Sequence, residues 1–297
     1  MREALLIVNP LASEVSEERV ASVRQALQRA ASVTTLMTER AGHATELAEA
    51  VRPDLAAIFV YSGDGGFNEA VNGADGSVPL GFVPGGATSV LPRALGLPRD
   101  PVAAAGRLAE ALDRGSTRRL SVGRVNGRRF MFSAGVGLDA AIVRRVDALG
   151  RSRGRRPGDL AFTWAAAGVL LDARGRFEPA LEVKGLGRAA FALVANGPAY
   201  AYVGRRPLRV APQTRFELGL DVVAPARVRP STLPRLLRFA LLGRGQTTAR
   251  DILYAHDLDR VEVACDAPMS LQADGEDLGD VEAVLFECER AALPVLI

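Results

Sequence analysis

Glycines and an aspartate gather directly after one short apolar run, in a pattern that could hold a phosphate. In the segment "YSGDGGFNEAVNG" (residues 61–73), Gly63, Asp64, Gly65 and Gly66 follow the run "LAAIFV". Glycines let a ligand approach backbone N–H groups closely, and a helix starting just afterwards would add the positive end of its dipole. Asp64 would repel a phosphate unless a divalent cation lay between them, which points to Mg²⁺. A plain strand-to-helix turn rich in glycine explains this one segment equally well.

A second glycine turn favours the phosphate interpretation. The segment "PGGATSVLPRALGLP" comes directly after the next apolar run, "LGFV". Because the carboxyl ends of parallel strands meet at one edge of a sheet, we expect the two turns to lie side by side, with Asn9 at the same edge. Thr88 and Ser89 could donate hydroxyl groups to a phosphate, or they could simply cap the helix that follows.

The elements that must position these residues change in character along the chain. Strand-like and helix-like segments alternate up to about Thr117, which is typical of a parallel sheet covered by helices. Short strands joined by turns then dominate, starting with a hairpin signal at Asn126-Gly127. We predict an α/β nucleotide-binding domain at residues 1–117 and a mostly antiparallel β-sandwich domain at residues 118–297. The last strand could return to the first domain.

Composition excludes several classes of protein. The 297 residues are 48% hydrophobic with a net charge of +3, which fits a folded globular chain rather than a disordered one. We find no signal-peptide pattern and no apolar run of about 20 residues. Cys265 and Cys288 are too few and too far apart for a disulfide framework or a metal cluster. We therefore expect a cytoplasmic protein.

One segment concentrates positive charge. "RRVDALGRSRGRRPGD" carries Arg144, Arg145, Arg151, Arg153, Arg155 and Arg156. It could be a solvated loop, or a patch that binds an anionic lipid surface and makes the protein peripheral to the membrane. No aromatic residues are interleaved for base stacking, so we expect no nucleic-acid partner. Nothing in the sequence predicts the oligomeric state.

Five motifs in order give the chain a family resemblance: "IVNPLAS", "TERAGHATELA", "SGDGGFNEAVNG", "PGGATSVLPRALGLP" and "LQADGEDLG". Together they resemble the bacterial diacylglycerol kinase catalytic domain family, lipid kinases related to sphingosine and ceramide kinases. The resemblance implies a phosphofructokinase-like N-terminal domain and a C-terminal β-sandwich. It also implies transfer of the γ-phosphoryl group of ATP to a lipid hydroxyl, with a diacylglycerol-like acceptor. The sequence does not select among lipid acceptors.

The resemblance also implies roles for individual residues. Those implied to bind ATP are Asn9, Pro10, Thr38, Ser62, Gly63, Asp64, Gly65, Gly66, Asn68, Glu69, Gly86 and Thr88. Asp64 is implied to contact Mg²⁺ through the nucleotide. Asp274, or Glu276 two residues on, is implied to face the acceptor hydroxyl. A carboxylate is a poor base for an alcohol, so its main task would be orientation. Without the resemblance, Asp274-Gly275 indicates only a β-turn.

Departures from the family pattern leave turnover open. Ser62 replaces the first glycine of the family loop and Gly66 its threonine, which removes a hydroxyl near the phosphates. Val90, Ser121 and Leu218 stand where aspartates are frequent. The turn at Leu218 holds a structural Mg²⁺ in some relatives, so we expect no metal there.

Three alternatives compete with the lipid kinase. One is a family member that has lost turnover and binds nucleotide or lipid. Another is an NAD kinase-like enzyme, since NAD kinases share the Gly-Gly-Asp-Gly loop. The third is a nicotinamide dinucleotide protein, suggested by Gly135, Gly137 and Ala140 in "SAGVGLDAA" with Asp159 about 20 residues on.

Overall fold

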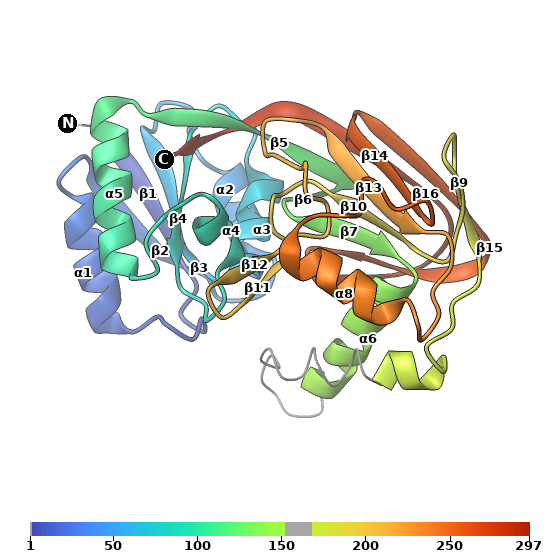
Figure 1. Ribbon diagram of the computed structural model, residues 1–297. Helices are drawn as coiled ribbons and strands as arrows, with labels where there is room; N and C mark the ends of the chain where they lie inside the picture. The colour runs from blue at the N-terminus through green and yellow to red at the C-terminus, as the bar shows by residue number, and fades with distance from the viewer. Residues whose placement is uncertain (1, 152–167) are drawn as a thin grey trace. The chain divides into compact units, whose positions relative to one another are not determined.

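The computed structural model describes residues 2–151 and 168–297 and divides the chain into two compact units (Figure 1). Met1–Val122 and Arg290–Ile297 form the first unit, and Gly123–Glu289 form the second. The division falls within strand β5 (Thr117–Val125), whose first residue is the boundary predicted from the sequence. The C-terminal end of the chain belongs to the first unit.

The first unit is built on a parallel sheet of order β2-β1-β3-β4. The end of β16 (Glu276–Leu296) joins this sheet, with Val295 pairing with Leu80 of β4 in parallel. The helices and strands alternate as predicted: β1 (Glu3–Val8), α1 (Glu17–Leu27), β2 (Ser32–Met37), α2 (His43–Glu49), β3 (Ala57–Ser62), α3 (Asp64–Gly73), β4 (Leu80–Pro84), α4 (Val90–Ala94) and α5 (Pro101–Arg114).

Local signals account for the helices that cover this sheet. Ser16 accepts a hydrogen bond from the backbone N–H of Arg19 at the start of α1, and Asp100 does the same for Ala103 at the start of α5. Both helices bury an apolar face in the same core cluster, where Leu27 and Leu108 meet the fully buried strand β3. The sheet is therefore held rigidly beneath the turns at its carboxyl edge.

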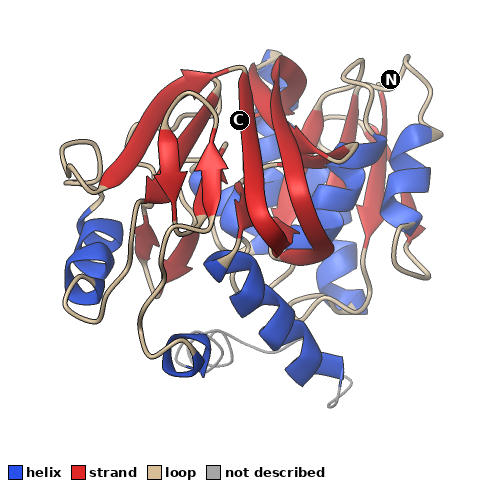
Figure 2. Ribbon diagram, turned by 90° about the vertical axis from the view of Figure 1, so that its right-hand side faces the viewer, coloured by secondary structure: helices blue, strands red, loops and turns tan. Residues whose placement is uncertain are grey.

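The second unit is antiparallel, as predicted. Its main path of strands runs β14-β13-β10-β7-β15-β16, and neighbours along it pair antiparallel. The elements after β5 are β6 (Arg128–Phe130), β7 (Ser133–Val136), α6 (Leu138–Arg151), β8 (Leu181–Val183), β9 (Gly187–Ala189), β10 (Ala192–Ala195), β11 (Ala201–Val203), β12 (Arg206–Leu208), β13 (Leu220–Pro225), α8 (Leu233–Leu242), β14 (Ile252–Leu258) and β15 (Arg260–Ala273), which pairs with β16. Figure 2 shows these strands beside the helices that flank them.

The first turn of this unit follows its sequence signal. Asn126 and Gly127 join β5 to β6 with φ angles of 49° and 79°. Two consecutive residues in the left-handed region are what a two-residue hairpin of type I′ requires, and Asn-Gly adopts it at low cost.

Candidate functional site

The two glycine turns of the first unit lie in contact. Strands β3 and β4 end together, and the N–H of Gly85 donates to the carbonyl oxygen of Ser62 at 2.7 Å. A Cβ placed on Gly86 would lie only 3.0 Å from the Cα of Gly63. A side chain at this position would force the turns apart, so glycine is required for the contact that the parallel arrangement predicts.

Helix α3 begins at Asp64, earlier than the sequence indicated. Gly65 and Gly66 therefore belong to its first turn rather than to a loop. The N-cap residue, Gly63, has extended backbone and offers no side chain to the N–H groups of that turn. The first N–H groups of a helix have no acceptor within the helix. Those of Gly65 and Gly66 can therefore donate to an anion, at the positive end of the helix dipole.

Ser62 and Gly66 fit each other. Ser62 is 2% exposed, and its Oγ has no hydrogen-bond partner in the described part of the chain. A Cβ on Gly66 would lie 2.2 Å from that Oγ and 2.8 Å from the Ser62 Cβ. The side chain of Ser62 thus occupies the space that a residue 66 side chain would need. Gly66 lacks the hydroxyl of the family's threonine, and the Ser62 side chain brings a hydroxyl to the same place.

Asp64 ties the first turn to the second. Its Oδ2 accepts from the N–H of Val90 at 2.9 Å, and its Oδ1 accepts from the N–H of Leu91 at 3.2 Å. The residue that precedes α4, Ser89, has a left-handed backbone (φ 42°) and makes no side-chain cap of its own. Asp64 therefore caps α4 from a distance. Val90 takes part through its backbone, which no side-chain pattern reveals.

Two further residues of the predicted loop lie deeper in α3. The Oε2 of Glu69 accepts from the N–H of Ala44 at 3.2 Å, at the start of α2, and Thr45 Oγ1 donates to the Glu69 carbonyl oxygen at 2.9 Å. Asn68 is buried. Its carbonyl oxygen and its Oδ1 both accept hydrogen bonds from Nδ2 of Asn72. These contacts join α2 to α3 and hold the first turn of α3 in place.

The other predicted nucleotide contacts lie at the same edge of the sheet. Asn9 follows β1, where its N–H donates to Tyr61 O at 3.0 Å and its Oδ1 accepts from the N–H of Leu11 at 3.0 Å. Thr38 follows β2 and donates its N–H to the carbonyl of Val8 at 2.8 Å. Two more members of the predicted set complete the edge: exposed Pro10 and half-buried Thr88.

Tyr61 is a supporting residue that sequence reasoning missed. Its hydroxyl donates to the carbonyl oxygen of Glu14 at 2.7 Å, while the N–H of Glu14 donates to Gly85 O at 2.9 Å. Burial raises the pKa of Tyr61 to about 12, so the hydroxyl stays protonated and keeps donating at neutral pH. The segment after β1 is thereby fastened to the second glycine turn.

In the second unit, Asp274 and Gly275 form the two-residue turn between β15 and β16. Both have positive φ, 48° and 80°. The Asp274 carboxylate accepts from the backbone N–H of Met131 at 2.6 Å, Phe132 at 2.8 Å and Ser133 at 3.2 Å. Three such donors fix the carboxylate and, equally, fix the segment that leads into β7.

Glu276 faces a different partner. It forms an ion pair with Arg128 of β6, with 2.6 Å between the closest nitrogen and oxygen. The two carboxylates considered for the acceptor site are therefore not interchangeable. Asp274 organises backbone at the start of β7, whereas Glu276 is held by an arginine on another strand.

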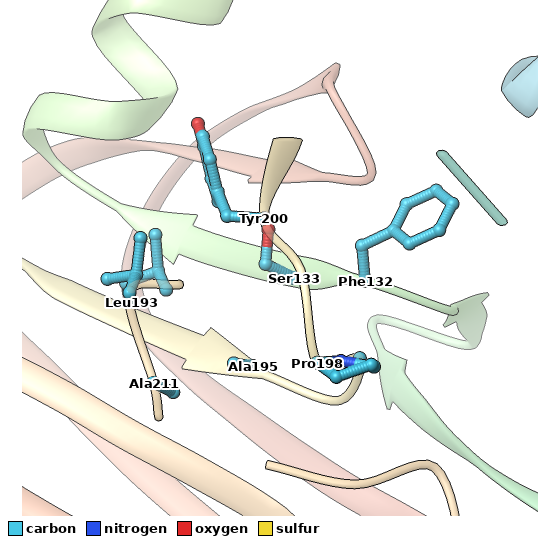
Figure 3. Close-up of a pocket in the computed structure, with 9 residues that line it drawn as sticks. Phe132, Ser133, Leu193, Ala195, Pro198, Tyr200 and Ala211 are labelled. Atoms are coloured by element: carbon cyan, nitrogen blue, oxygen red, sulfur yellow. The ribbon is translucent and has the colours of Figure 1, made fainter. Parts of the chain in front are cut away.

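A pocket adjoins the Asp274 turn, because Phe132 and Ser133 both line it and donate to Asp274 (Figure 3). It is narrow, with essentially no room for a water-sized molecule, although most of the residues around it have apolar side chains. The remaining lining residues are Leu193, Ala195, Gly197, Pro198, Tyr200, Val210 and Ala211.

Behind this pocket lies a buried polar cluster that no sequence motif indicates. Asp139 accepts hydrogen bonds from the hydroxyl of Tyr200 and from Nε2 of Gln272. Burial raises the pKa of Asp139, and these two donors only partly oppose that effect. The pKa of Tyr200 is raised too, by burial and by the adjacent carboxylate. Their sequence positions are too far apart for any local pattern to join them.

The residues present do not form a cage for a metal ion. Within the described ranges, no group of three or more His, Cys, Asp or Glu side chains is placed to hold one. The Asp64 carboxylate is already engaged by two N–H groups of α4. Near Leu218, the buried Asp221 is bonded by Tyr254 and His256 side chains.

Part of the arginine cluster is engaged within its own chain. Arg144 bonds Asp277 through Nε and Nη2, both at 2.9 Å, and pairs with Asp280, while Arg145 pairs with Asp172. Arg151 ends α6, and Arg153, Arg155 and Arg156 lie outside the described residues. In the part of the chain that is described, no helix combines the length and apolarity needed to cross a membrane.

The dinucleotide alternative is wrong. Gly135, Gly137 and Ala140 do join a strand, β7, to a helix, α6. Both neighbours of β7, however, pair with it antiparallel, so no parallel strand-helix-strand unit exists there. Gly135 instead gives room to Asp139, whose Oδ2 would lie 2.7 Å from an added Cβ. The predicted acidic partner, Asp159, lies outside the described residues.

Comparison with known proteins decides the family. Residues 3–125 match the diacylglycerol kinase catalytic domain, and residues 133–297 match the YegS C-terminal NAD kinase beta sandwich-like domain. The chain belongs to the bacterial diacylglycerol kinase family of lipid kinases. The second description also records the likeness between this family's sandwich and that of NAD kinases.

Individual members of the family bear out the fold. A diacylglycerol kinase of Bacillus subtilis (strain 168) is 37% identical over 143 residues, a stretch that covers 46% of this chain and 46% of that protein. The match thus spans about half of the relative's length. A solved diacylglycerol kinase from Bacillus anthracis str. Sterne superposes with a TM-score of 0.72 at 18% identity, covering 99% of this chain and 96% of the other.

Proposed function

We propose that this protein is an ATP-dependent lipid kinase that transfers the γ-phosphoryl group to the hydroxyl of a diacylglycerol-like lipid. The observation that carries the proposal is the first turn of α3. It combines the N–H groups of Gly65 and Gly66 at a helix start that no side chain caps, a second glycine turn in contact, and the buried Ser62 hydroxyl, which lacks a partner among the described residues. A buried hydroxyl without a hydrogen-bond partner lowers stability, unless a bound ligand supplies the missing partner.

In this proposal the N-terminal unit binds the nucleotide through its backbone. The N–H groups at the start of α3 and the Ser62 hydroxyl would donate to phosphate oxygens, and Mg²⁺ bound to those phosphates would neutralise part of their charge. No P-loop lysine is needed. Asp64 and Glu69 would act indirectly, because their carboxylates hold α4 and α2 against the turn.

The C-terminal unit would hold the acceptor. The pocket that Phe132 lines would have to widen to take the hydrophobic body of a lipid, and the Asp274 turn beside it would orient the hydroxyl. Phosphoryl transfer depends mainly on positioning and on stabilising charge. During transfer the acceptor oxygen bonds to phosphorus, the bond to the ADP oxygen breaks, and the hydroxyl proton leaves.

The test is a transfer assay with γ-labelled ATP, Mg²⁺ and detergent micelles that contain one lipid at a time. Acceptors should include a diacylglycerol, a long-chain base, ceramide and an isoprenoid alcohol. We expect label in the diacylglycerol product and its loss in Asp274→Asn. ATP binding without label in any acceptor would contradict the kinase and favour a binding protein that has lost turnover.

One observation supports a second candidate, an NAD kinase-like activity: residues 133–297 match a domain described as NAD kinase beta sandwich-like. The same assay with NAD as acceptor separates the two. Label in a phosphorylated dinucleotide, with none in lipid, would favour this candidate.

A further inference from the structure

Helix α8 of the C-terminal unit is apolar on two faces. Its inner face packs into the unit, where Phe239 joins a cluster with Leu193, Val223 and Ile252. Its outer face carries Leu237, Leu241 and Leu242, which are 60%, 46% and 52% exposed. Large leucines this exposed, three on one ten-residue helix, need a reason beyond folding.

Arginines frame these leucines. Arg238 lies between them on the exposed side and Arg244 follows the helix end, both exposed. The chain contains no aspartate or glutamate from residue 226 to residue 250. The other arginine of the helix, Arg235, has partners within the unit: it pairs with Asp251 and lies over the ring of Phe239.

The neighbouring hairpin extends the basic surface. Helix α8 packs beside β12, and the N–H of Arg209 donates to the carbonyl oxygen of Ala240 at 2.8 Å. The Arg209 side chain runs along the end of α8, since an added Cβ on Gly243 would lie 3.0 Å from its Cδ. Arg205 and Arg206 are exposed at the turn between β11 and β12. Figure 1 shows α8 on the outside of this unit.

A further exposed leucine lies on the segment that meets the start of α8. Leu171 is 76% exposed on the short helical segment at residues 168–172. Gly175, just after it, approaches Pro230 and Leu233, and Phe177 pairs with Val228. The apolar surface therefore continues past the helix itself.

We propose that the α8 surface, defined by Leu237, Leu241, Leu242, Arg238 and Arg244, docks the protein on an anionic lipid bilayer. Leucines inserted among acyl chains with arginines at headgroup level are the arrangement that binds a helix flat in the interface. A second copy of the chain fits less well. A two-fold pairing would set this arginine-rich face against itself, with no acid on the helix to compensate.

This inference rests on the proposed lipid kinase, since a diacylglycerol acceptor is reached in a membrane. It assigns the docking surface to α8 rather than to the arginine cluster that the sequence suggested. Two of those, Arg144 and Arg145, already pair with acids of their own chain.

The experiment is co-sedimentation of the full chain with vesicles of phosphatidylcholine alone or with about one-third phosphatidylglycerol. We expect wild type to bind the anionic vesicles only. Leu237→Ser/Leu241→Ser and, separately, Arg238→Glu/Arg244→Glu should each weaken binding about tenfold or more. Val102→Ser and Arg107→Glu, at exposed positions on α5, are the matched controls and should bind as wild type.

Thermal unfolding and gel filtration without lipid accompany each variant. Binding of the α8 variants equal to wild type, or no binding by wild type, would overturn the proposal. A wild-type dimer that dissociates in the leucine variants would also overturn it, since the α8 surface would then bind a second copy of the chain. Transfer to a short-chain diacylglycerol in detergent should persist in the α8 variants. Absence of transfer in wild type would count against the kinase, whatever the vesicles show.

Discussion

The molecule uses two of its three Asp-Gly dipeptides, Asp64-Gly65 and Asp274-Gly275, with opposite results. The first opens helix α3 after a parallel strand, and the second closes an antiparallel hairpin with both residues in the left-handed region. In each, the carboxylate accepts backbone N–H groups from a distant segment.

The difference lies in which N–H groups remain for a ligand. At Asp64 the carboxylate bonds α4 and does not cap its own helix, so the N–H groups of Gly65 and Gly66 can donate to a ligand. At Asp274 the carboxylate itself consumes the donors of residues 131–133 and fixes the backbone beside the pocket. The first turn is suited to bind an anion, and the second to shape a site for a neutral molecule.

The largest difference should appear on removing each carboxylate. Asp274→Ala leaves the backbone N–H groups of residues 131–133 without their acceptor. It should therefore lower the free energy of unfolding by about 3 kcal/mol. Asp64→Ala removes a cap from a short helix and should cost about 1–2 kcal/mol. Urea unfolding gives the values, and hydrogen exchange at Phe132 should accelerate only in the first variant.

Asp280→Ala is the control for Asp274→Ala, because Asp280 lies in the next strand and its carboxylate is half exposed. It should change stability by about 1 kcal/mol or less. Equal losses of unfolding free energy in Asp64→Ala and Asp274→Ala would contradict the difference proposed between the two turns.

The next effect tests the fit of Ser62 and Gly66. Gly66→Ala places a Cβ against the Ser62 side chain and should cost about 1–3 kcal/mol. Ser62→Gly/Gly66→Ala removes the overlap and should recover most of that loss. A double-mutant cycle measures the coupling, expected at about 1–2 kcal/mol. Additive losses would show that the two residues do not share the space.

The buried Asp139 gives the second unit a pH dependence. Since burial raises its pKa above the unfolded value, protonated Asp139 favours folding, and that contribution is lost as pH rises through the raised pKa. Asp139→Asn removes this loss, so its melting temperature relative to wild type should increase as pH rises above the ordinary range of a carboxyl group. A difference that stays constant as pH rises would mean that the group does not titrate differently on folding.

The smallest expected effects come from two glycine-to-alanine substitutions that test backbone conformation apart from packing. Gly275 has φ 80° and open space around its Cβ position, so Gly275→Ala should cost about 1 kcal/mol from conformation alone. Gly106, in the interior of α5 with equally open space, should gain stability on substitution by alanine, by up to about 1 kcal/mol. Thermal unfolding of both variants measures the difference, and a loss at Gly106 would contradict this account.

Much of the fold follows from sequence because its signals are local. The alternation of segments, the Asn126-Gly127 hairpin and the meeting of two glycine turns at one sheet edge all derive from periodicity and strand direction. The start of α3 was misplaced because glycine is a poor helix former. The contact of Asp64 with α4 and the extended backbone of the N-cap residue Gly63 favour a helix start at Asp64, although glycine itself disfavours helix.

The contacts that the sequence did not reveal share a different property. Ser62 and Gly66 meet across a corner between strand and helix, and Asp139 meets Tyr200 and Gln272 from distant parts of the chain. Only the folded structure brings these pairs together, so neither spacing nor composition indicates them. The same holds for the α8 leucines, whose exposure is decided by which face the sheet covers.

The most direct test of the division between the two Asp-Gly turns is calorimetric titration with Mg²⁺-ATP. We predict that Gly66→Ala weakens nucleotide binding at least about tenfold, because it displaces the first turn of α3. Asp274→Asn, in the hairpin of the other unit, should bind ATP within about twofold of wild type. The reverse outcome, with affinity lost in Asp274→Asn and kept in Gly66→Ala, would contradict the assignment of the nucleotide to the first turn.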